Sequence, residues 1–103
     1  MEYRLDIFTK NADSLLELLA MNCRKRRLEA GYSRKTLAEK SGVPAPTIER
    51  FETTGRISLE SFCKIAIVFD YYEETASLLG TAKYSTGEEL ATINKNKHRK
   101  KGR

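Results

Sequence analysis

The stretch SRKTLAEKSGVPAPTIERFE, residues 33–52, predicts two short helices joined by a tight turn. Ser33 is suited to cap the first helix, and Gly42 can adopt the positive backbone angle that such a turn requires. The second helix must begin near Pro44–Pro46, because proline is tolerated in the first turn of a helix but not deeper. The residues expected to fill the wedge between the helices are apolar: Leu37, Val43 and Ile48. A helical hairpin within an ordinary bundle is the alternative interpretation.

Further helices are expected on both sides of this pair. Hydroxyl side chains suited to helix N-termini precede apolar stretches, and we expect helices to begin at Ser14, Ser58 and Ser85. In two of these places a glutamate follows three residues later, which is the capping-box pattern. Another helix is expected to begin around Tyr72 or Glu73 and to end at Gly80. The sequence therefore predicts an all-α domain of five or six helices.

The two ends of the chain depart from this helical pattern. Charged and apolar residues alternate over residues 2–7, as in a half-buried strand, which would need a partner such as the same segment of a second subunit. An unstructured arm is the other interpretation. Residues 94–103 carry six basic side chains and no acidic one, and we expect them to be disordered. The expected divisions are an N-terminal arm or short strand (1–13), a folded domain (14–93) and a basic tail (94–103).

Size and composition limit the class of protein. A chain of 103 residues leaves room for one domain, with none to spare for a ligand-sensing domain, and no apolar run approaches the roughly 20 residues of a membrane span. The N-terminus lacks the order of a secretion signal, so we expect a cytoplasmic protein with no membrane partner. Two cysteines without CxxC spacing and one histidine argue against a metal site or a disulfide scaffold. The one histidine, His98, lies in the tail, and paired carboxylates and a glycine-rich phosphate loop are absent, which argues against an enzyme. No cofactor and no small-molecule ligand are expected.

Charge is distributed unevenly along the chain. The net charge is +5, yet residues 24–56 hold nine basic and four acidic side chains, whereas residues 57–93 hold two basic and six acidic. A basic middle, an acidic distal half and a basic tail indicate two different partner surfaces. Simple solvation of helix surfaces is the alternative, especially for the distal half.

Residues within and around the hairpin resemble the phage-repressor (Cro-like or XRE) family of helix-turn-helix domains, over roughly residues 14–80. The residues that carry the resemblance are Arg27, Ala38, Gly42, Val43, Ile48, Glu52 and the segment 57–69. The resemblance implies a lambda-repressor-like fold, an ion pair between Arg27 and Glu52, and binding of double-stranded DNA with the third helix in the major groove. One such unit covers little DNA, so a homodimer on two half-sites is expected.

The resemblance also implies which residues face DNA. The outward positions of the third helix are Ala45, Pro46, Glu49 and Arg50. Arg50 is the main candidate for a base contact, because its guanidinium can donate hydrogen bonds to both O6 and N7 of a guanine. Glu49 could accept a hydrogen bond from a cytosine amino group, or it could repel phosphates. Ala45 and Pro46 offer apolar contact alone, unlike the polar residues usual in the family. The candidates for DNA-backbone contacts are Arg34, which replaces the usual glutamine, with Lys35, Thr47, Thr53 and Arg56.

Three stretches in the distal part of the chain carry a second resemblance: RFETTGRISLESFCKIAIVFD (50–70), YSTGEEL (84–90) and KHRKKGR (97–103). They resemble HipB-type antitoxins, which pair with HipA-like serine/threonine kinase toxins. This resemblance implies a repressor that autoregulates its own operon and binds a kinase toxin. A stand-alone phage-type regulator and an RNA-binding or transcription-bridging adaptor are the alternatives.

Overall fold

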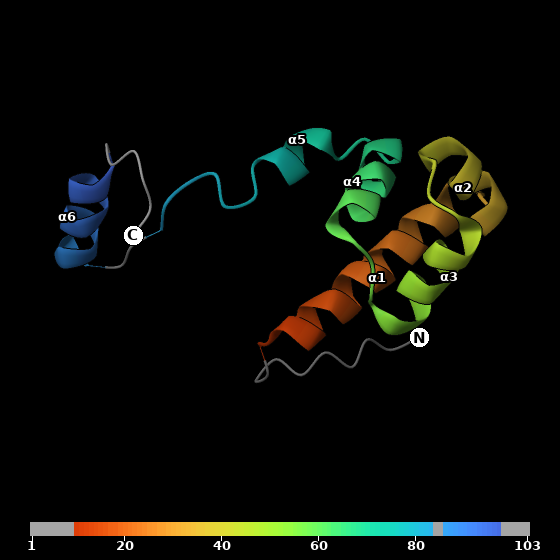
Figure 1. Ribbon diagram of the computed structural model, residues 1–103, viewed down its shortest axis with the longest axis horizontal. Helices are drawn as coiled ribbons and strands as arrows, with labels where there is room; N and C mark the ends of the chain where they lie inside the picture. The colour runs from red at the N-terminus through yellow and green to blue at the C-terminus, as the bar shows by residue number, and fades with distance from the viewer. Residues whose placement is uncertain (1–9, 84–85, 98–103) are drawn as a thin grey trace.

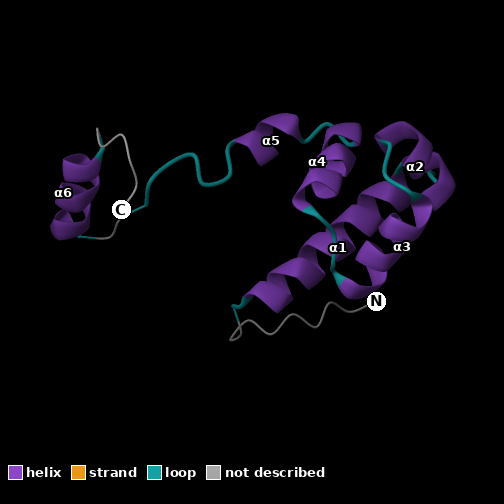
Figure 2. Ribbon diagram, in the orientation of Figure 1, coloured by secondary structure: helices purple, strands orange, loops and turns teal. Residues whose placement is uncertain are grey.

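The structure, a computed structural model, describes residues 10–83 and 86–97 and contains helices but no strand within these residues (Figures 1 and 2). The helices are α1 (Ala12–Glu29), α2 (Arg34–Ser41), α3 (Ala45–Thr54), α4 (Leu59–Val68), α5 (Tyr72–Ala76) and α6 (Gly87–Asn96). The predicted all-α fold is therefore confirmed. The alternating segment 2–7, with its predicted strand or arm, lies outside the described residues.

The start of α1 differs from the sequence prediction. The helix begins at Ala12 and not at Ser14, because Asn11 is its N-cap. The Asn11 side-chain oxygen accepts a hydrogen bond from the backbone N–H of Ser14 at 2.9 Å. Asparagine is among the strongest N-cap residues, and Asp13 adds a negative charge in the first turn, where the helix dipole favours it. The capping role assigned to Ser14 is therefore wrong by one turn.

The other N-terminal caps follow the expected chemistry. Ser33 and Ser58 cap α2 and α4, each accepting a hydrogen bond from a backbone N–H three residues later, so these two predictions are confirmed. The cap of α6 is Thr86, whose hydroxyl oxygen accepts from the backbone N–H of Glu89 at 3.0 Å. The expected cap Ser85 lies outside the described residues. Thr86 and Glu89 form the same sequence pattern one residue later.

The core lies where α1 to α4 meet. Its buried members are Ala20, Cys23, Leu37, Val43, Ile48, Phe51 and Ile65. α1 packs on α3, and α2 packs on both α3 and α4. Aromatic pairs extend the core: the rings of Phe51 and Phe62 meet edge to face with centroids 6.0 Å apart, and those of Tyr32 and Phe69 stack at 6.2 Å. The predicted wedge between α2 and α3 is thus part of one continuous apolar core.

Two glycines fix the ends of the α2–α3 pair. Gly42 ends α2 with φ of 80°, and Gly55 ends α3 with φ of 78°, so both lie in the left-handed region that favours glycine. A Cβ atom on Gly42 would meet nothing within 4 Å, but one on Gly55 would lie 3.2 Å from Leu16 Cβ. Gly55 is therefore required both by its backbone angle and by the close approach of α1.

The distal part of the chain is less regular than expected. α5 ends at Ala76 and not at Gly80, and the chain then passes through Leu79 with φ of 62°. α6 continues to Asn96, so its last three residues belong to the segment 94–103 that the sequence predicts as disordered. Figure 1 shows α6 apart from the α1–α4 bundle. Within the described residues, no helix combines the length and the apolar character needed to cross a membrane.

Candidate nucleic-acid interface

α3 has a buried face and an open face. Its first turn is set by Pro44, the N-cap, whose carbonyl oxygen accepts from the backbone N–H groups of Thr47 and Ile48. Ile48 and Phe51 point into the core and are 0% and 1% exposed. Since residues three apart share one face of a helix, the opposite face is left to solvent. The sequence pattern therefore places the third helix at the surface of the domain.

The open face carries the residues expected to contact bases. Pro46, Glu49 and Arg50 are exposed, and Ala45 and Thr47 are partly buried. Among the described residues, no side-chain hydrogen bond or ion pair holds the Arg50 guanidinium. Its charge and its five donors are thus available to a partner.

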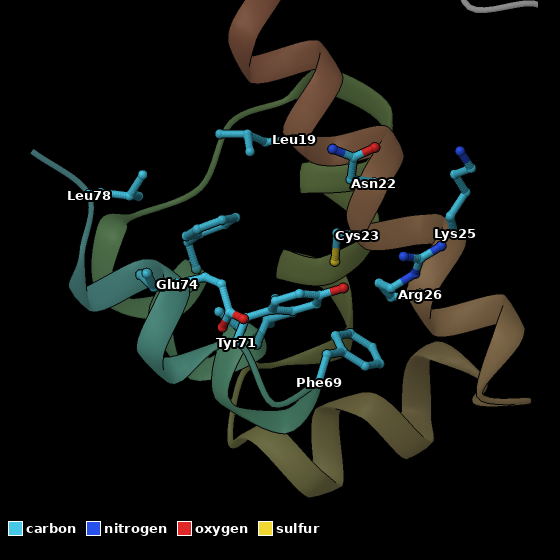
Figure 3. A pocket seen from close by; sticks show the side chains of 13 residues that line it. Leu19, Asn22, Cys23, Lys25, Arg26, Phe69, Tyr71, Glu74 and Leu78 are labelled. Atoms are coloured by element: carbon cyan, nitrogen blue, oxygen red, sulfur yellow. The ribbon is translucent and has the colours of Figure 1, made fainter.

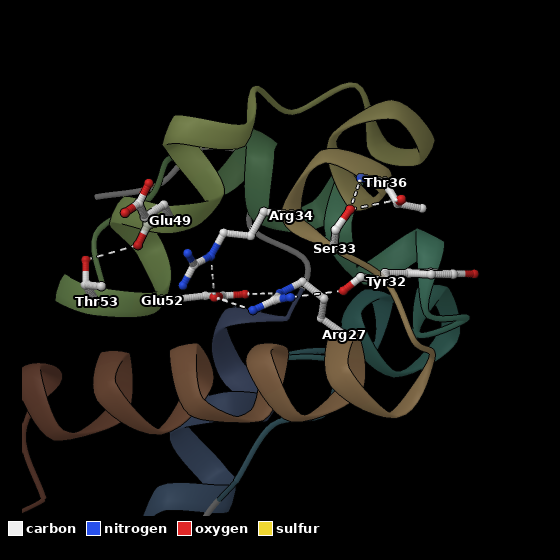
Figure 4. Close-up of polar contacts among 8 residues, drawn as sticks. All are labelled: Arg27, Tyr32, Ser33, Arg34, Thr36, Glu49, Glu52 and Thr53. Carbon is white, nitrogen blue, oxygen red and sulfur yellow. Dashed lines mark hydrogen bonds and ion pairs between the residues drawn. The ribbon is translucent and has the colours of Figure 1, made fainter.

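A buried carboxylate at the end of α3 ties three helices together (Figure 4). Arg27 of α1 donates to Glu52 from Nε at 2.7 Å and from Nη2 at 3.0 Å, in a bidentate pair. Arg27 also donates from Nη1 to the carbonyl oxygen of Tyr32 at 2.9 Å. Arg34, the first residue of α2, donates from Nε to Glu52 Oε1 at 3.0 Å. One carboxylate therefore fixes the ends of α1 and α3 and the start of α2.

The electrostatics of this cluster follow from its burial. The side chains of Glu52 and Arg27 are only 1% and 8% exposed. Burial by itself raises the pKa of Glu52, but hydrogen bonds and charges from Arg27 and Arg34 outweigh it and hold the pKa below the ordinary value of 4.5. The Glu52 hydrogen bonds also raise the pKa of Arg27 above its usual value, against the effect of burial. The cluster is thus ionised throughout the neutral range, with a net charge of +1.

The contact between Arg34 and Glu52 is absent from the sequence predictions, which give Arg34 a role at the DNA backbone alone. The position of Arg34 in the sequence nevertheless gives one indication of this contact. A positive charge at the first position of a helix is unfavourable against the helix dipole, so an arginine there gains from a nearby carboxylate. The Arg34 side chain is still 37% exposed, and its two terminal nitrogens make no hydrogen bond to the described residues. Arg34 therefore keeps donors for an external anion.

The other residues predicted to contact the DNA backbone lie on different elements. Lys35 is exposed on α2, while Arg56 follows α3 and lies with Nη2 3.6 Å from Asp13 Oδ1 in an exposed ion pair. Thr53 donates its hydroxyl hydrogen toward the carbonyl oxygens of Glu49 and Arg50, at 3.0 and 3.2 Å, so its hydroxyl bonds back to its own helix. Figure 4 shows the bond to Glu49. The structure thus brings Arg34 close to α3 through Glu52, and it leaves Thr53 with the weakest case for an external contact.

The cysteines take no part in this surface. Cys23 is buried in the core and Cys63 is half-buried, and neither is in a disulfide. Burial, with a smaller contribution from the charge of Glu52, raises the pKa of Cys23 to about 11, despite the opposing charge of Arg27. The Cys23 thiol is therefore neutral near pH 7 and packs as a small apolar group. Among the described residues, no cluster of histidine, cysteine and acidic side chains could hold a metal ion.

The chain matches a family model described as helix-turn-helix over residues 24–75. The match covers 52 of the 103 residues and includes the last third of α1, all of α2 to α4 and most of α5. Comparisons with curated proteins and with solved structures give no match. The matched segment contains the α2–α3 pair, its glycine turn and the Arg27–Glu52 pair. The chain therefore belongs to the helix-turn-helix family of the XRE, lambda-repressor-like type, and is a DNA-binding transcription regulator.

Proposed function

We propose that the protein represses transcription by placing α3 in the major groove of double-stranded DNA, with Arg50 bonded to a guanine. The observation that carries this proposal is the open face of α3, on which Arg50 is exposed and its guanidinium makes no hydrogen bond or ion pair with the described residues. An arginine can bond O6 and N7 of guanine at once, which distinguishes this base pair from the other three. The inner face of α3, fixed by Glu52, supplies the rigid support that such a contact needs.

The rest of the open face would add selectivity of other kinds. Ala45 and Pro46 lie at the N-terminal end of α3, where they would make apolar contacts such as one with a thymine methyl group. The Glu49 carboxylate would accept a hydrogen bond from a cytosine amino group, or it would disfavour DNA sites at which a phosphate approaches it. One subunit would thus obtain its clearest base discrimination from Arg50.

Contacts with phosphates would hold the domain in register on the duplex. The residues concerned lie on α2 (Arg34 and Lys35), on α3 (Thr47) and just after α3 (Arg56), and none of the three cations is fully buried. Such contacts carry little sequence information but supply much of the affinity, and they weaken as salt is added. Two copies on half-sites about 34 Å apart would double the contacts, so we propose a homodimer as the binding form.

The finer identity that we propose is an antitoxin that autoregulates its operon and binds a HipA-like kinase toxin. Support comes from the resemblance over residues 50–70, 84–90 and 97–103, and from the exposed acidic pair Glu73 and Glu74 on α5, which offers a second surface away from α3. The test is co-expression with a kinase-like protein encoded beside it, if the genome carries one. Co-purification and relief of growth arrest would support the antitoxin role, whereas the absence of such a neighbour would leave a stand-alone regulator.

A binding experiment separates DNA from RNA as the ligand. Duplexes are selected from a randomised library with the full chain, and retention on the selected duplex is compared with retention on a scrambled duplex and on a structured RNA. The proposal requires preference for the selected duplex, reduced in Arg50→Ala. Equal binding to all three, or preference for the RNA, would favour the adaptor alternative.

A further inference from the structure

An apolar groove of about 430 Å³ lies between α1 and the α4–α5 segment (Figure 3). Its apolar lining includes Leu19, Phe62, Ile65, Phe69 and Leu78. Removal of apolar surface from water is favourable, so an occupant with an apolar face would be held in this groove.

The α1 side of the groove is basic and holds an unsatisfied donor. Lys25 and Arg26 lie on this side (Figure 3), and Lys25 makes no ion pair with the described residues. Arg26 donates from Nη2 to Glu29 at 2.7 Å, but its buried Nε has no hydrogen-bond partner among the described residues. A buried donor is unfavourable until an acceptor reaches it. The groove therefore fits an occupant that combines an apolar face with acidic side chains.

Helix α6 has this combination and lacks a surface to pack on. It belongs to none of the closely packed helix pairs, and Figure 1 shows it apart from the α1–α4 bundle. Leu90 and Ile93, three residues apart, share one face of α6, and Glu88 and Glu89 lie in its first turn. A helix of ten residues is marginal in water by itself and gains most of its stability from the packing of its apolar face. α6 therefore requires a surface that covers Leu90 and Ile93.

We infer that α6 docks in the groove of its own chain, with its apolar pair against the lining and its acidic first turn toward the basic side. The structure shows α6 undocked, and docking is a second arrangement of the same chain. Leu78 lines the groove and Gly87 begins α6, and the chain between them can extend over roughly 30 Å. This short tether gives α6 a high effective concentration at the groove, and the opposite charges add to the apolar contact. The inference goes beyond the proposed function, since it involves no DNA.

The first test looks for the contact directly, by nuclear Overhauser effects in the full chain without DNA. The methyl groups of Leu90 and Ile93 are expected to give effects to the side chains of Leu19 and Phe62. An isotope-filtered experiment on a mixture of labelled and unlabelled chains shows whether these effects arise within one chain. Effects that arise only between two chains would assign the groove to a second copy and overturn the inference. Effects to the groove from residues 2–8 in place of α6, or from neither segment, would also overturn it.

The second test measures hydrogen exchange of the backbone amides of α6, which docking slows. Leu90→Asp is expected to speed this exchange about tenfold or more, because the burial of one leucine side chain changes an equilibrium constant by at least that factor. Thr92→Asp is the matched control, since Thr92 is exposed on α6 and outside the apolar pair. Equal effects of the two changes would mean that aspartate weakens the helix itself and that no docked face exists.

A third test places the change on α1, so that the sequence of α6 is untouched. Lys25→Glu removes a positive charge from the groove and is expected to speed the exchange of the α6 amides severalfold. Arg24→Glu is the matched control, because Arg24 is exposed on the same helix and does not line the groove. Exchange in α6 that responds to neither change, or to both alike, would overturn the docking of α6 at this groove.

Discussion

Glu52 and Arg34 are joined by a hydrogen bond of 3.0 Å although Arg34 belongs to α2 and Glu52 to α3. The carboxylate is already held by Arg27, so two arginines share one buried acid. This sharing directs the Nε of Arg34 inward and leaves its terminal nitrogens for an outside anion. The same residue therefore stabilises the domain and, in the proposed complex, contacts the DNA backbone.

The first prediction concerns Glu52→Ala, which removes the common partner of both arginines. The change would leave the largely buried Arg27 without its counter-charge, and we expect the free energy of unfolding to fall by about 3–5 kcal/mol. DNA affinity should fall with it, because α3 would lose its tie to α1. Thermal and denaturant melts measure the first effect and duplex titration the second.

Glu49→Ala is the matched control, since Glu49 is exposed on the same helix and its carboxylate has no partner among the described residues. It should alter base preference without lowering the melting temperature. Melting of Glu52→Ala at the parent's temperature would show that the cluster does not stabilise the fold.

The second prediction is a pH dependence. The folded-state pKa of Glu52 lies below its ordinary value of 4.5, so the native state holds its proton less tightly than the unfolded state does. Its contribution is therefore complete above about pH 4.5 and is lost as the pH falls through the folded-state pKa. The stability difference between the parent and Glu52→Gln, followed by denaturant unfolding, should be constant near neutrality and shrink in acid. A difference that grows in acid would have the wrong sign.

The third prediction uses salt to find phosphate contacts. If Arg34 neutralises one phosphate in each subunit, Arg34→Gln should make the slope of log affinity against log salt shallower by about one unit per subunit. Arg24→Gln is the control, because Arg24 is exposed on α1 and is not among the predicted DNA contacts. An unchanged slope for Arg34→Gln would assign Arg34 to the ion pair alone.

The fourth prediction separates two glycines with nearly equal backbone angles. Gly42→Ala should lower the free energy of unfolding by about 1–2 kcal/mol, which is the cost of placing alanine in the left-handed region. No steric cost is added, because a Cβ atom at this position would meet nothing within 4 Å. Gly55→Ala carries that cost and also a Cβ at 3.2 Å from Leu16, and should be clearly worse in denaturant unfolding. Equal losses would mean that α1 moves aside at Gly55.

The features that were predicted correctly from the sequence are determined by local chemistry. The α2–α3 pair depends on Ser33, Gly42 and Pro44, whose effects act within a few residues, and on apolar spacing that places Leu37 and Ile48 in the core. The open face of α3 follows from the same periodicity. Residues that are close in the sequence are enough to determine each of these features.

The features that the sequence prediction missed depend on longer-range or competing effects. The Arg34–Glu52 contact joins residues 18 positions apart, on two helices whose packing must be known first. At α1, two residues suited to an N-cap lie three positions apart, and Asn11 caps the helix instead of Ser14. At α5, Gly80 is the expected residue for a left-handed turn after the helix, yet the helix already ends at Ala76 and the positive φ belongs to Leu79, which residue type alone does not predict.

The most direct test of the central claim is the base preference of Arg50. Duplexes selected by the parent and by Arg50→Ala from the same randomised library are compared, and the guanines of the selected site are methylated at N7 in the major groove. We expect one guanine per half-site at which methylation blocks the parent, with Arg50→Ala losing about 1–3 kcal/mol of specific binding and accepting any base there. Identical preferences in the two proteins, with methylation at N7 tolerated throughout, would contradict a recognition helix that places Arg50 against a base.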